Sequence, residues 1–282
     1  MAKQITTQNI PFPHKRMRAL LGRGKCVCIV GYGLSSEARV PHYYDIQKGV
    51  WSCLTESSKI NPFEHTEHYQ LVMQWFNWRR GGSNTRQPLK PFVALRELQR
   101  FFGMRVVSQC ADGLALANGV VDVCELYGNV LRVRCSQGHS FSDWPSVLNG
   151  NDNAGCSVCG SILLPDVQMF SWNHKSEASD AAAEMIKHAK LLIKIGADDD
   201  LAPFINLKQS DIAHLPVIEI MESGFQMHEG NASFKISMAD IDEEIKHLTG
   251  NSQFAASPKS YEAAISNFIT LYQPREQDSD HE

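Results

Sequence analysis

Short, largely apolar runs mark the predicted strands of this chain, and helical periodicity fills the stretches between them. We predict strands at 26–30, where all five residues are apolar, and at 104–108, 191–195 and 217–220. Helical patterns occupy 93–102, 180–190 and 241–248, and a last one runs from Pro258 toward Tyr272. A continuous apolar run is typical of a strand buried on both faces of a parallel sheet. We therefore predict an α/β protein with a Rossmann-like, doubly wound parallel sheet. Asp240 and Glu243 predict a capping box at the start of the helix 241–248.

Two long stretches interrupt this alternation of strands and helices. Residues 46–91 are polar and rich in aromatic side chains, with one helical pattern and a loop of Gly, Pro and Asn. Residues 130–163 have few helix signals and hold three of the eight cysteines. We predict that the first stretch is a smaller helical insertion and that the second is a separate zinc-ribbon module.

The predicted domain organisation follows from these interruptions. The Rossmann-like large domain comprises 25–45, 92–129 and 164–256, the helical insertion 46–91, and the zinc module 130–163. An N-terminal segment, 1–24, precedes the large domain, and 257–282 form a C-terminal helix with a disordered tail.

Composition excludes several classes of protein. The 282 residues are 43% hydrophobic and 21% charged, as in ordinary globular proteins. The net charge of −4 argues against a general nucleic-acid binder. No run approaches the roughly 20 apolar residues that span a bilayer, and the polar start of the chain lacks a signal-peptide core. We expect a cytoplasmic protein whose cysteines are free thiols or metal ligands rather than disulfides.

Two close pairs of metal-ligand residues lie in the predicted zinc module. Cys135 precedes His139 by four positions, and Cys156 precedes Cys159 by three, each pair on a tight turn. Two such turns can close a tetrahedron around Zn²⁺ with no open position, which is the arrangement of structural sites. The alternative is four unrelated residues in a loop-rich region. The paired spacing favours a structural zinc ion held by these four side chains.

A glycine turn joins the first predicted strand to a helix. The segment reads Gly31-Tyr32-Gly33-Leu34-Ser35-Ser36. A turn of this kind can present backbone N–H groups to an anionic ligand at the start of the helix. By itself it is a weak dinucleotide signal, because Ser36 stands where the usual pattern has a third glycine.

Several motifs, taken in chain order, resemble those of the sirtuin family. Gly31–Pro41 resembles the Gly-Ala-Gly turn that runs to Ile-Pro-Asp-Phe-Arg, and Ser108–Leu114 is similar to Thr-Gln-Asn-Ile-Asp-Gly-Leu. Glu125–Asn129 resembles Glu-Leu-His-Gly-Ser, and Gly196–Pro203 is similar to Gly-Thr-Ser-Leu-x-Val-x-Pro. The four predicted zinc ligands fall where a sirtuin keeps its zinc ribbon. The resemblance covers about 25–221 and implies a sirtuin-like fold, with NAD or a related nucleotide as the cofactor.

The resemblance also implies roles for individual residues. The cofactor-binding positions would be Gly31, Gly33, Ser35, Gln109 and Gly196. Asp112 would hold the carboxamide of the nicotinamide ring. Tyr127 stands where the family has its general-base histidine, and Cys110 stands where it has an asparagine beside the reacting ribose.

Both exchanges change the chemistry that the family uses. Tyrosine, with an ordinary pKa of about 10, is poorly suited to act as a base near neutral pH. Cys110 is either a nucleophile with a stabilised thiolate or a small buried apolar filler, and we favour the filler.

The predicted phosphate-binding side departs from the family as well. Tyr32 replaces a small alanine and either turns away from the pocket or fills it. Ala197 and Asp198 replace two hydroxyl side chains, and Asp199 and Asp200 follow. A carboxylate about 4 Å from a phosphate oxygen costs about 1 kcal/mol in water and about 4 kcal/mol at an intermediate dielectric constant. A solvent-facing polar turn is the equal alternative.

Two functional hypotheses follow from these observations. The first is a degenerate sirtuin, a pseudoenzyme that does not deacylate lysine and instead binds a nucleotide-like small molecule or a protein partner. The second is a divergent enzyme that cleaves the nicotinamide–ribose bond of NAD and transfers acyl or ADP-ribosyl groups, with Tyr127 or Cys110 replacing the usual chemistry. We favour the first, because several exchanges fall on one reaction path.

Overall fold

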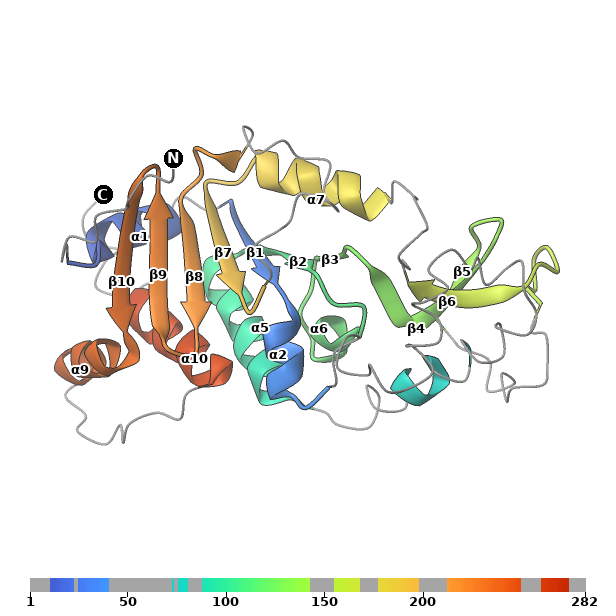
Figure 1. The fold of residues 1–282 in the computed structure, drawn as a ribbon, viewed down its shortest axis with the longest axis horizontal. Helices are drawn as coiled ribbons and strands as arrows, with labels where there is room; N and C mark the ends of the chain where they lie inside the picture. The colour runs from blue at the N-terminus through green and yellow to red at the C-terminus, as the bar shows by residue number, and fades with distance from the viewer. Residues whose placement is uncertain are drawn as a thin grey trace, which may run out of the picture.

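The fold was analysed in a computed structural model of the chain. The structure describes residues 11–22, 25–40, 73, 76–80, 88–142, 155–167, 177–197, 212–249 and 260–273. Within these ranges the strands form two sheets, one of seven strands and one of three (Figure 1). No helix in the same ranges is long and apolar enough to cross a membrane.

The seven-stranded sheet has the strand order β10-β9-β8-β7-β1-β2-β3. Its strands are β1 (Cys26–Val30), β2 (Arg105–Ser108), β3 (Val123–Glu125), β7 (Leu191–Ile195), β8 (Val217–Met221), β9 (Gly224–Glu229) and β10 (Ala232–Ser237). The five strands from β8 to β3 pair in parallel, whereas β9 and β10 are antiparallel. The chain reverses its direction of progress across the sheet between β1 and β7. Such a switch point, at the carboxyl ends of parallel strands, is where doubly wound folds bind ligands.

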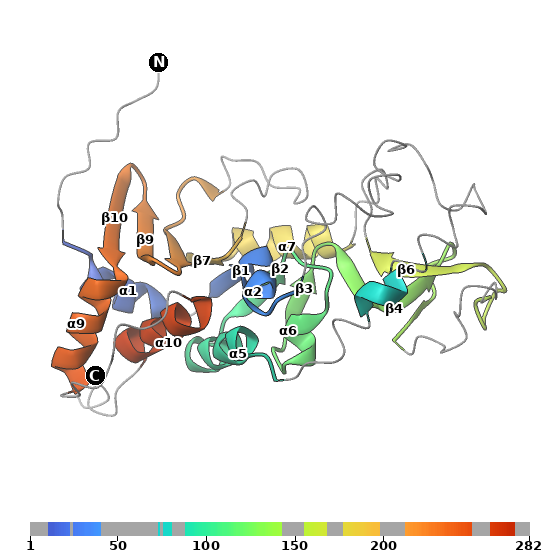
Figure 2. The ribbon, with the colours of Figure 1, turned by 60° about the horizontal axis from the view of Figure 1, so that its bottom comes forward.

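Helices pack on both faces of this sheet. They are α1 (His14–Leu21), α2 (Tyr32–Glu37), α5 (Lys90–Phe102), α6 (Leu114–Ala117), α7 (Glu177–Lys187), α9 (Met238–Thr249) and α10 (Tyr261–Tyr272). Figure 2 shows α7 on one side of the sheet and α5 and α10 on the other. All five residues of β1 are buried, with Val27 and Ile29 in the cluster under α7 and Cys26, Cys28 and Val30 in the opposite cluster. The predicted α/β class is confirmed, and so is the interpretation of the continuous apolar run 26–30 as a strand buried on both faces.

The small sheet lies beside the end of the large one and has the strand order β5-β4-β6. Its strands are β4 (Gly128–Cys135), β5 (Ser140–Phe141) and β6 (Leu163–Val167), all antiparallel. Only two residues separate β3 from β4, so the small sheet is attached directly to the edge strand of the large one. A separate cluster of buried residues, Val133, Cys135, Cys156 and Leu163, forms its core.

The hairpin of β9 and β10 was not predicted from the sequence, and α9 begins at Met238 rather than at residue 241. Phe225, Met227 and Ile236 are buried, but polar residues alternate with them, as in a half-exposed antiparallel ribbon. The predicted capping box at Asp240 and Glu243 was wrong. Helix α9 begins at Met238, and the Ser237 hydroxyl accepts a hydrogen bond from the Asp240 N–H (3.3 Å).

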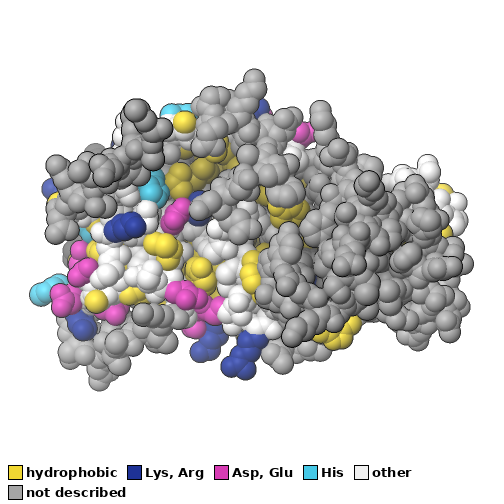
Figure 3. Space-filling model, viewed as in Figure 1, with side chains coloured by type: hydrophobic (Ala, Val, Ile, Leu, Met, Phe, Trp, Pro, Cys, Tyr) yellow, Lys and Arg dark blue, Asp and Glu magenta, His cyan; other side chains and the backbone are white. Residues whose placement is uncertain are grey.

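The surface near this hairpin carries charges of both signs. In the view of Figure 3, acidic, basic and histidine side chains are interspersed over the end of the molecule that holds β8 to β10 and α9. The described side chains on this face form no broad field of one charge.

Candidate functional site

The glycine turn after β1 crosses a second turn after β7. The Gly31 N–H donates to the Ile195 carbonyl (3.0 Å), and the Gly33 N–H donates to the Gly196 carbonyl (2.9 Å). A Cβ atom at Gly31 would lie 2.3 Å from the Ala197 Cα atom, and one at Gly33 would lie 2.7 Å from the Gly196 Cα atom. Both contacts exclude a side chain. The two turns therefore meet backbone to backbone at the switch point of the sheet, which explains the glycines at these positions.

Tyr32 follows Gly31 directly and is the first residue of α2. Its hydroxyl donates a hydrogen bond to the Val40 carbonyl (2.9 Å), so the side chain is tied to the segment after α2. The predicted contribution of Asp198, Asp199 and Asp200 lies outside the described residues.

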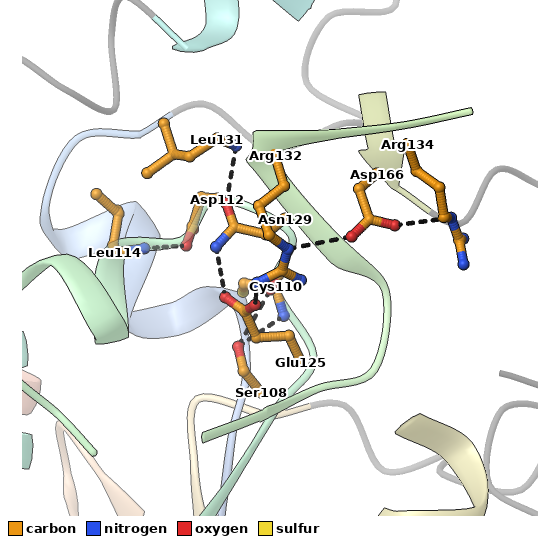
Figure 4. A network of polar contacts seen from close by, with 10 residues as sticks. All are labelled: Ser108, Cys110, Asp112, Leu114, Glu125, Asn129, Leu131, Arg132, Arg134 and Asp166. Atoms are coloured by element: carbon orange, nitrogen blue, oxygen red, sulfur yellow. Dashed lines mark hydrogen bonds and ion pairs between the residues drawn. The ribbon is translucent and has the colours of Figure 1, made fainter. Parts of the chain in front are cut away.

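Asp112 is a buried carboxylate between the turn after β2 and helix α2. Its side chain accepts hydrogen bonds from the Ser35 hydroxyl (2.5 Å) and from the Leu114 N–H (3.0 Å), the latter drawn in Figure 4. Burial raises the pKa of Asp112, and these two bonds and the charge of Arg79 oppose that rise. The residue is 4% exposed, so its charge depends on these few neighbours rather than on water.

Cys110 lies beside the same pair of residues. Its Sγ atom is 3.6 Å from the Ser35 Oγ atom, and its N–H donates to the Ser108 hydroxyl (3.1 Å). The thiol is partly exposed and belongs to neither buried cluster of the large sheet. Cys110 is therefore not the buried filler that we favoured from the sequence.

An ion-pair network joins the end of β3 to the small sheet (Figure 4). Arg132 on β4 donates to Glu125 (2.7 Å) and to Asp166 on β6 (3.1 Å). Asn129 donates to the other oxygen of Glu125 (2.8 Å), and Arg134 pairs with the other oxygen of Asp166 (3.1 Å). Burial raises the pKa of Glu125, and Arg132 opposes that rise. This network was not predictable from the sequence, because its members lie on three different strands.

Tyr127 lies in the short connection between β3 and β4. It is partly buried and packs against the apolar cluster under α7, as does Ala197 from the turn after β7. Gln109 begins the turn after β2, and its N–H donates to the Val30 carbonyl at the end of β1 (2.8 Å). The predicted site residues thus gather at the carboxyl ends of β1, β2 and β7 and at the exit of β3.

The four predicted zinc ligands converge in the small sheet. The ligand atoms of Cys135, His139, Cys156 and Cys159 all lie within 4.8 Å of one another. The Cys135 and Cys159 sulfurs are 3.7 Å apart, and the Nδ1 atom of His139 is 3.4 Å from the Cys135 sulfur and 3.6 Å from the Cys156 sulfur.

These distances fit a tetrahedral zinc ion. At the tetrahedral angle, Zn–S bonds of about 2.3 Å and Zn–N bonds of about 2.1 Å separate two sulfurs by about 3.8 Å, and a sulfur from a nitrogen by about 3.6 Å. The Ser161 hydroxyl lies 3.4 Å from the Cys159 sulfur, and its hydrogen bonding lowers the pKa of that thiol to about 6. A thiol that ionises easily favours metal binding, because the thiolate is the ligand form. The four side chains suit a closed, structural zinc site.

Sequence comparisons relate the chain to protein deacylases. The model of the Sir2 family matches residues 31–203. NAD-dependent protein deacylase 1 of Caldanaerobacter subterraneus subsp. tengcongensis is 30% identical over 182 residues, which cover 64% of this chain and 75% of that protein. The NAD-dependent protein deacylase of Aeropyrum pernix is 28% identical over 187 residues, covering 66% and 76%.

Solved structures show the same fold. A mutant Sir2 homologue in complex with ADP-ribose has a TM-score of 0.63 at 21% identity, covering 91% of this chain and 96% of that one. A Sir2 homologue–NAD complex has a TM-score of 0.61 at 21% identity, covering 79% and 88%. A His-to-Tyr variant of Sir2 with a p53 peptide and NAD has a TM-score of 0.53 at 22% identity, covering 74% and 87%. Since the family model spans more than half of its residues, this chain belongs to the Sir2 family.

Proposed function

We propose that this protein binds NAD or a related nucleotide at the carboxyl edge of β1 and β7, and that it does not deacylate lysine by the usual route of the family. The observation that carries the proposal is a contrast within one site. The Ser35–Asp112 pair and the crossed glycine turns form an intact frame. The position of the family's general base holds Tyr127 instead of a histidine.

Two features support nucleotide binding: the shape of the glycine crossing and the hydrogen-bond acceptor sites of the Asp112 carboxylate. The missing side chains at Gly31 and Gly33 let two turns cross closely at the switch point, where such folds take a ligand. The Asp112 carboxylate accepts hydrogen bonds from the Ser35 hydroxyl and the Leu114 N–H, whereas a carboxylate has about four acceptor sites. It therefore keeps the capacity to receive the N–H groups of a carboxamide. The names of the relatives and the NAD and ADP-ribose complexes of the structural neighbours point to the same ligand class.

Tyr127 argues against the usual reaction. A positioned general base contributes about 10²- to 10⁴-fold to a rate, and it must be able to accept a proton near the working pH. A phenol with an ordinary pKa of about 10 keeps its proton there. Cys110 in place of asparagine changes a second group beside the reacting ribose. When NAD is bound, it would supply the reactive nicotinamide–ribose bond, and this chain would hold that bond without a base to help break it.

A second candidate function rests on Cys110. Its partly exposed thiol, the Ser35 hydroxyl and the Asp112 carboxylate form a chain with separations of 3.6 and 2.5 Å. A thiol linked through a hydroxyl to a buried carboxylate of raised pKa has a route for its proton. This row of three side chains supports a divergent enzyme that cleaves NAD with the Cys110 thiolate as the nucleophile.

The test measures binding and turnover on the same preparations. Calorimetry and thermal shifts with NAD and ADP-ribose report binding, and nicotinamide release with an acylated peptide reports the reaction. We expect the wild-type protein to bind and not to release nicotinamide above the blank. Tyr127→His combined with Cys110→Asn should gain release, toward the roughly 10²- to 10⁴-fold that a base contributes.

The controls separate the two candidates. Asp112→Asn should weaken binding, and Tyr32→Phe, which removes a hydroxyl bonded to Val40, should not. Wild-type release that disappears in both Asp112→Asn and Cys110→Ser establishes the enzyme instead. A protein that binds neither nucleotide contradicts both candidates and leaves a protein partner as the ligand of this fold.

A further inference from the structure

The N-terminal end of helix α10 lies against the crossed glycine turns. A Cβ atom at Gly33 would be 2.8 Å from two ring carbons of Tyr261, and one at Gly196 would be 3.2 Å from the same ring. The Tyr261 ring therefore contacts the backbone of both turns at the point where the Gly33 N–H meets the Gly196 carbonyl. Tyr261 is partly buried and packs on the cluster that includes Leu34 and Ile265.

A carboxylate from the nucleotide-site helix fixes α10 in this position. Glu37, the last residue of α2, accepts hydrogen bonds from the N–H groups of Tyr261 and Glu262. The Ser260 hydroxyl accepts a third bond, from the Ala263 N–H (3.1 Å). The first N–H groups of a helix lack partners within it, so these bonds join α10 to α2 by satisfying them. Helix α2, which also carries Ser35, is thereby joined to α10 at its last residue.

We propose that Tyr261 is a positioning residue for the nucleotide site: its ring supports the crossing of the two glycine turns and so sets the place of α2 and Ser35. The inference rests on the proposed function, and it extends that function to a residue outside the family match at 31–203. Small residues at Gly33 and Gly196 leave a space that only a neighbour can fill. The flat ring of Tyr261 fills it from the α10 side.

The ring, rather than the hydroxyl, carries this role. The contacts to the turns come from the ring carbons Cε2 and Cζ. The nearby acidic groups, Glu222 and Glu37, together with burial, raise the pKa of Tyr261, so the hydroxyl stays neutral. Tyr261→Phe keeps the ring and should keep the function, whereas Tyr261→Ala leaves the crossing without support on one side.

Calorimetry with NAD on the full chain tests the proposal. We expect Tyr261→Ala to raise the Kd about tenfold, the ratio that corresponds to ~1.4 kcal/mol, and Tyr261→Phe to stay within about twofold of the wild type. Leu271→Ala is the matched control, because Leu271 is equally part of α10 but lies near its other end, about 15 Å along the helix. It should lower the melting temperature and leave the Kd unchanged.

Hydrogen exchange gives a readout that needs no ligand. The Gly33 amide should exchange faster in Tyr261→Ala than in the wild type. In Leu271→Ala, the exchange of the Gly33 amide should not be accelerated more than that of other amides. If Tyr261→Ala fails to fold, Tyr261→Leu keeps apolar volume without the flat ring and serves the same purpose. Equal Kd values and equal Gly33 exchange in wild type and variant overturn the role of Tyr261 alone. A wild-type protein that binds no NAD overturns the proposed function itself.

Discussion

The zinc cluster of the small sheet and the proposed nucleotide-binding edge of the large sheet match the family motifs to different degrees. Around the zinc cluster, all four ligand side chains are present and converge within 4.8 Å. At the carboxyl edge of β1 and β7, where we propose nucleotide binding, the glycine crossing and the Ser35–Asp112 pair are present, but Tyr127 and Cys110 stand where the family motifs have a histidine and an asparagine.

The difference indicates which positions cannot change without a loss of folding stability. A closed zinc site contributes directly to folding, so losing one ligand costs stability at once. The glycines at the crossing are protected for the same reason, because any side chain there would strike backbone atoms. Tyr127, in contrast, packs its ring on an apolar cluster, and a change of its polar end leaves that packing intact. Reactive side chains can therefore change while the scaffold around them persists.

The largest expected effect is at the zinc cluster. Cys156→Ser should abolish the binding of one zinc ion per chain and unfold the small sheet, since structural zinc contributes on the order of 10 kcal/mol to such modules. Among the residues of the small sheet that the structure describes, the apolar core that remains without the metal is small and lies around Val133 and Leu163. Elemental analysis and limited proteolysis measure the two effects. Cys110→Ser, outside the cluster, should keep the zinc; a folded, zinc-free wild-type protein would contradict the assignment.

The next effect lies at the junction between the two regions. Arg132→Met leaves Glu125, whose side chain is 6% exposed, without its cation. Breaking a fully buried pair costs about 3–5 kcal/mol, and because 31% of the Arg132 side chain is exposed we expect the lower end, about 3 kcal/mol. Urea unfolding measures this loss. Adding Glu125→Gln to the same chain should recover most of it, and no recovery would show that the ion pair is not the cause.

The deficit of Arg132→Met should also depend on pH. Burial already holds the pKa of Glu125 above its ordinary value, and losing Arg132 raises that pKa further. The penalty applies fully when Glu125 is charged, and it disappears when the folded protein binds a proton there. The difference in unfolding free energy between wild type and variant should therefore shrink as the pH falls from 7.5 toward 5. A constant difference would assign the loss to packing.

A smaller effect on stability is expected from a glycine-to-alanine substitution in each of the two regions. Gly33→Ala places a methyl group 2.7 Å from the Gly196 Cα atom, and such overpacking costs about 1–3 kcal/mol. Gly138→Ala, in the turn between two zinc ligands, meets open space and should cost about 1 kcal/mol through its positive φ of 87°. Thermal unfolding measures both costs. Only Gly33→Ala should weaken NAD binding, and equal affinities would mean that the crossing does not shape the site.

The smallest effect concerns Tyr32. Removing its hydroxyl in Tyr32→Phe breaks one hydrogen bond to the Val40 carbonyl, which contributes about 1 kcal/mol. We expect a slightly lower melting temperature and an unchanged Kd for NAD. A large change in the Kd would place the hydroxyl in the ligand pocket instead.

Short patterns along the chain were enough to predict several elements of this fold. β1 was predictable because its five residues are all apolar, and β7 because four of its five are. The glycine turn was predictable because so tight a turn needs residues without side chains. The zinc ligands were predictable because each pair lies within one turn of chain. The hairpin β9–β10 was not, since its buried Phe225 and Met227 alternate with polar residues in a ribbon at the sheet edge.

Contacts between residues far apart in the chain were not predictable from such patterns. Arg132 reaches Glu125 and Asp166 because β3, β4 and β6 come together at one corner, and Tyr261 reaches Gly33 because α10 packs on α2. It also placed Cys110 beside Ser35 rather than in the core. The physical reason is that such contacts depend on strand order and on how helices pack across a sheet. Periodicity along the chain reports which face of an element is buried, but not which partner covers it.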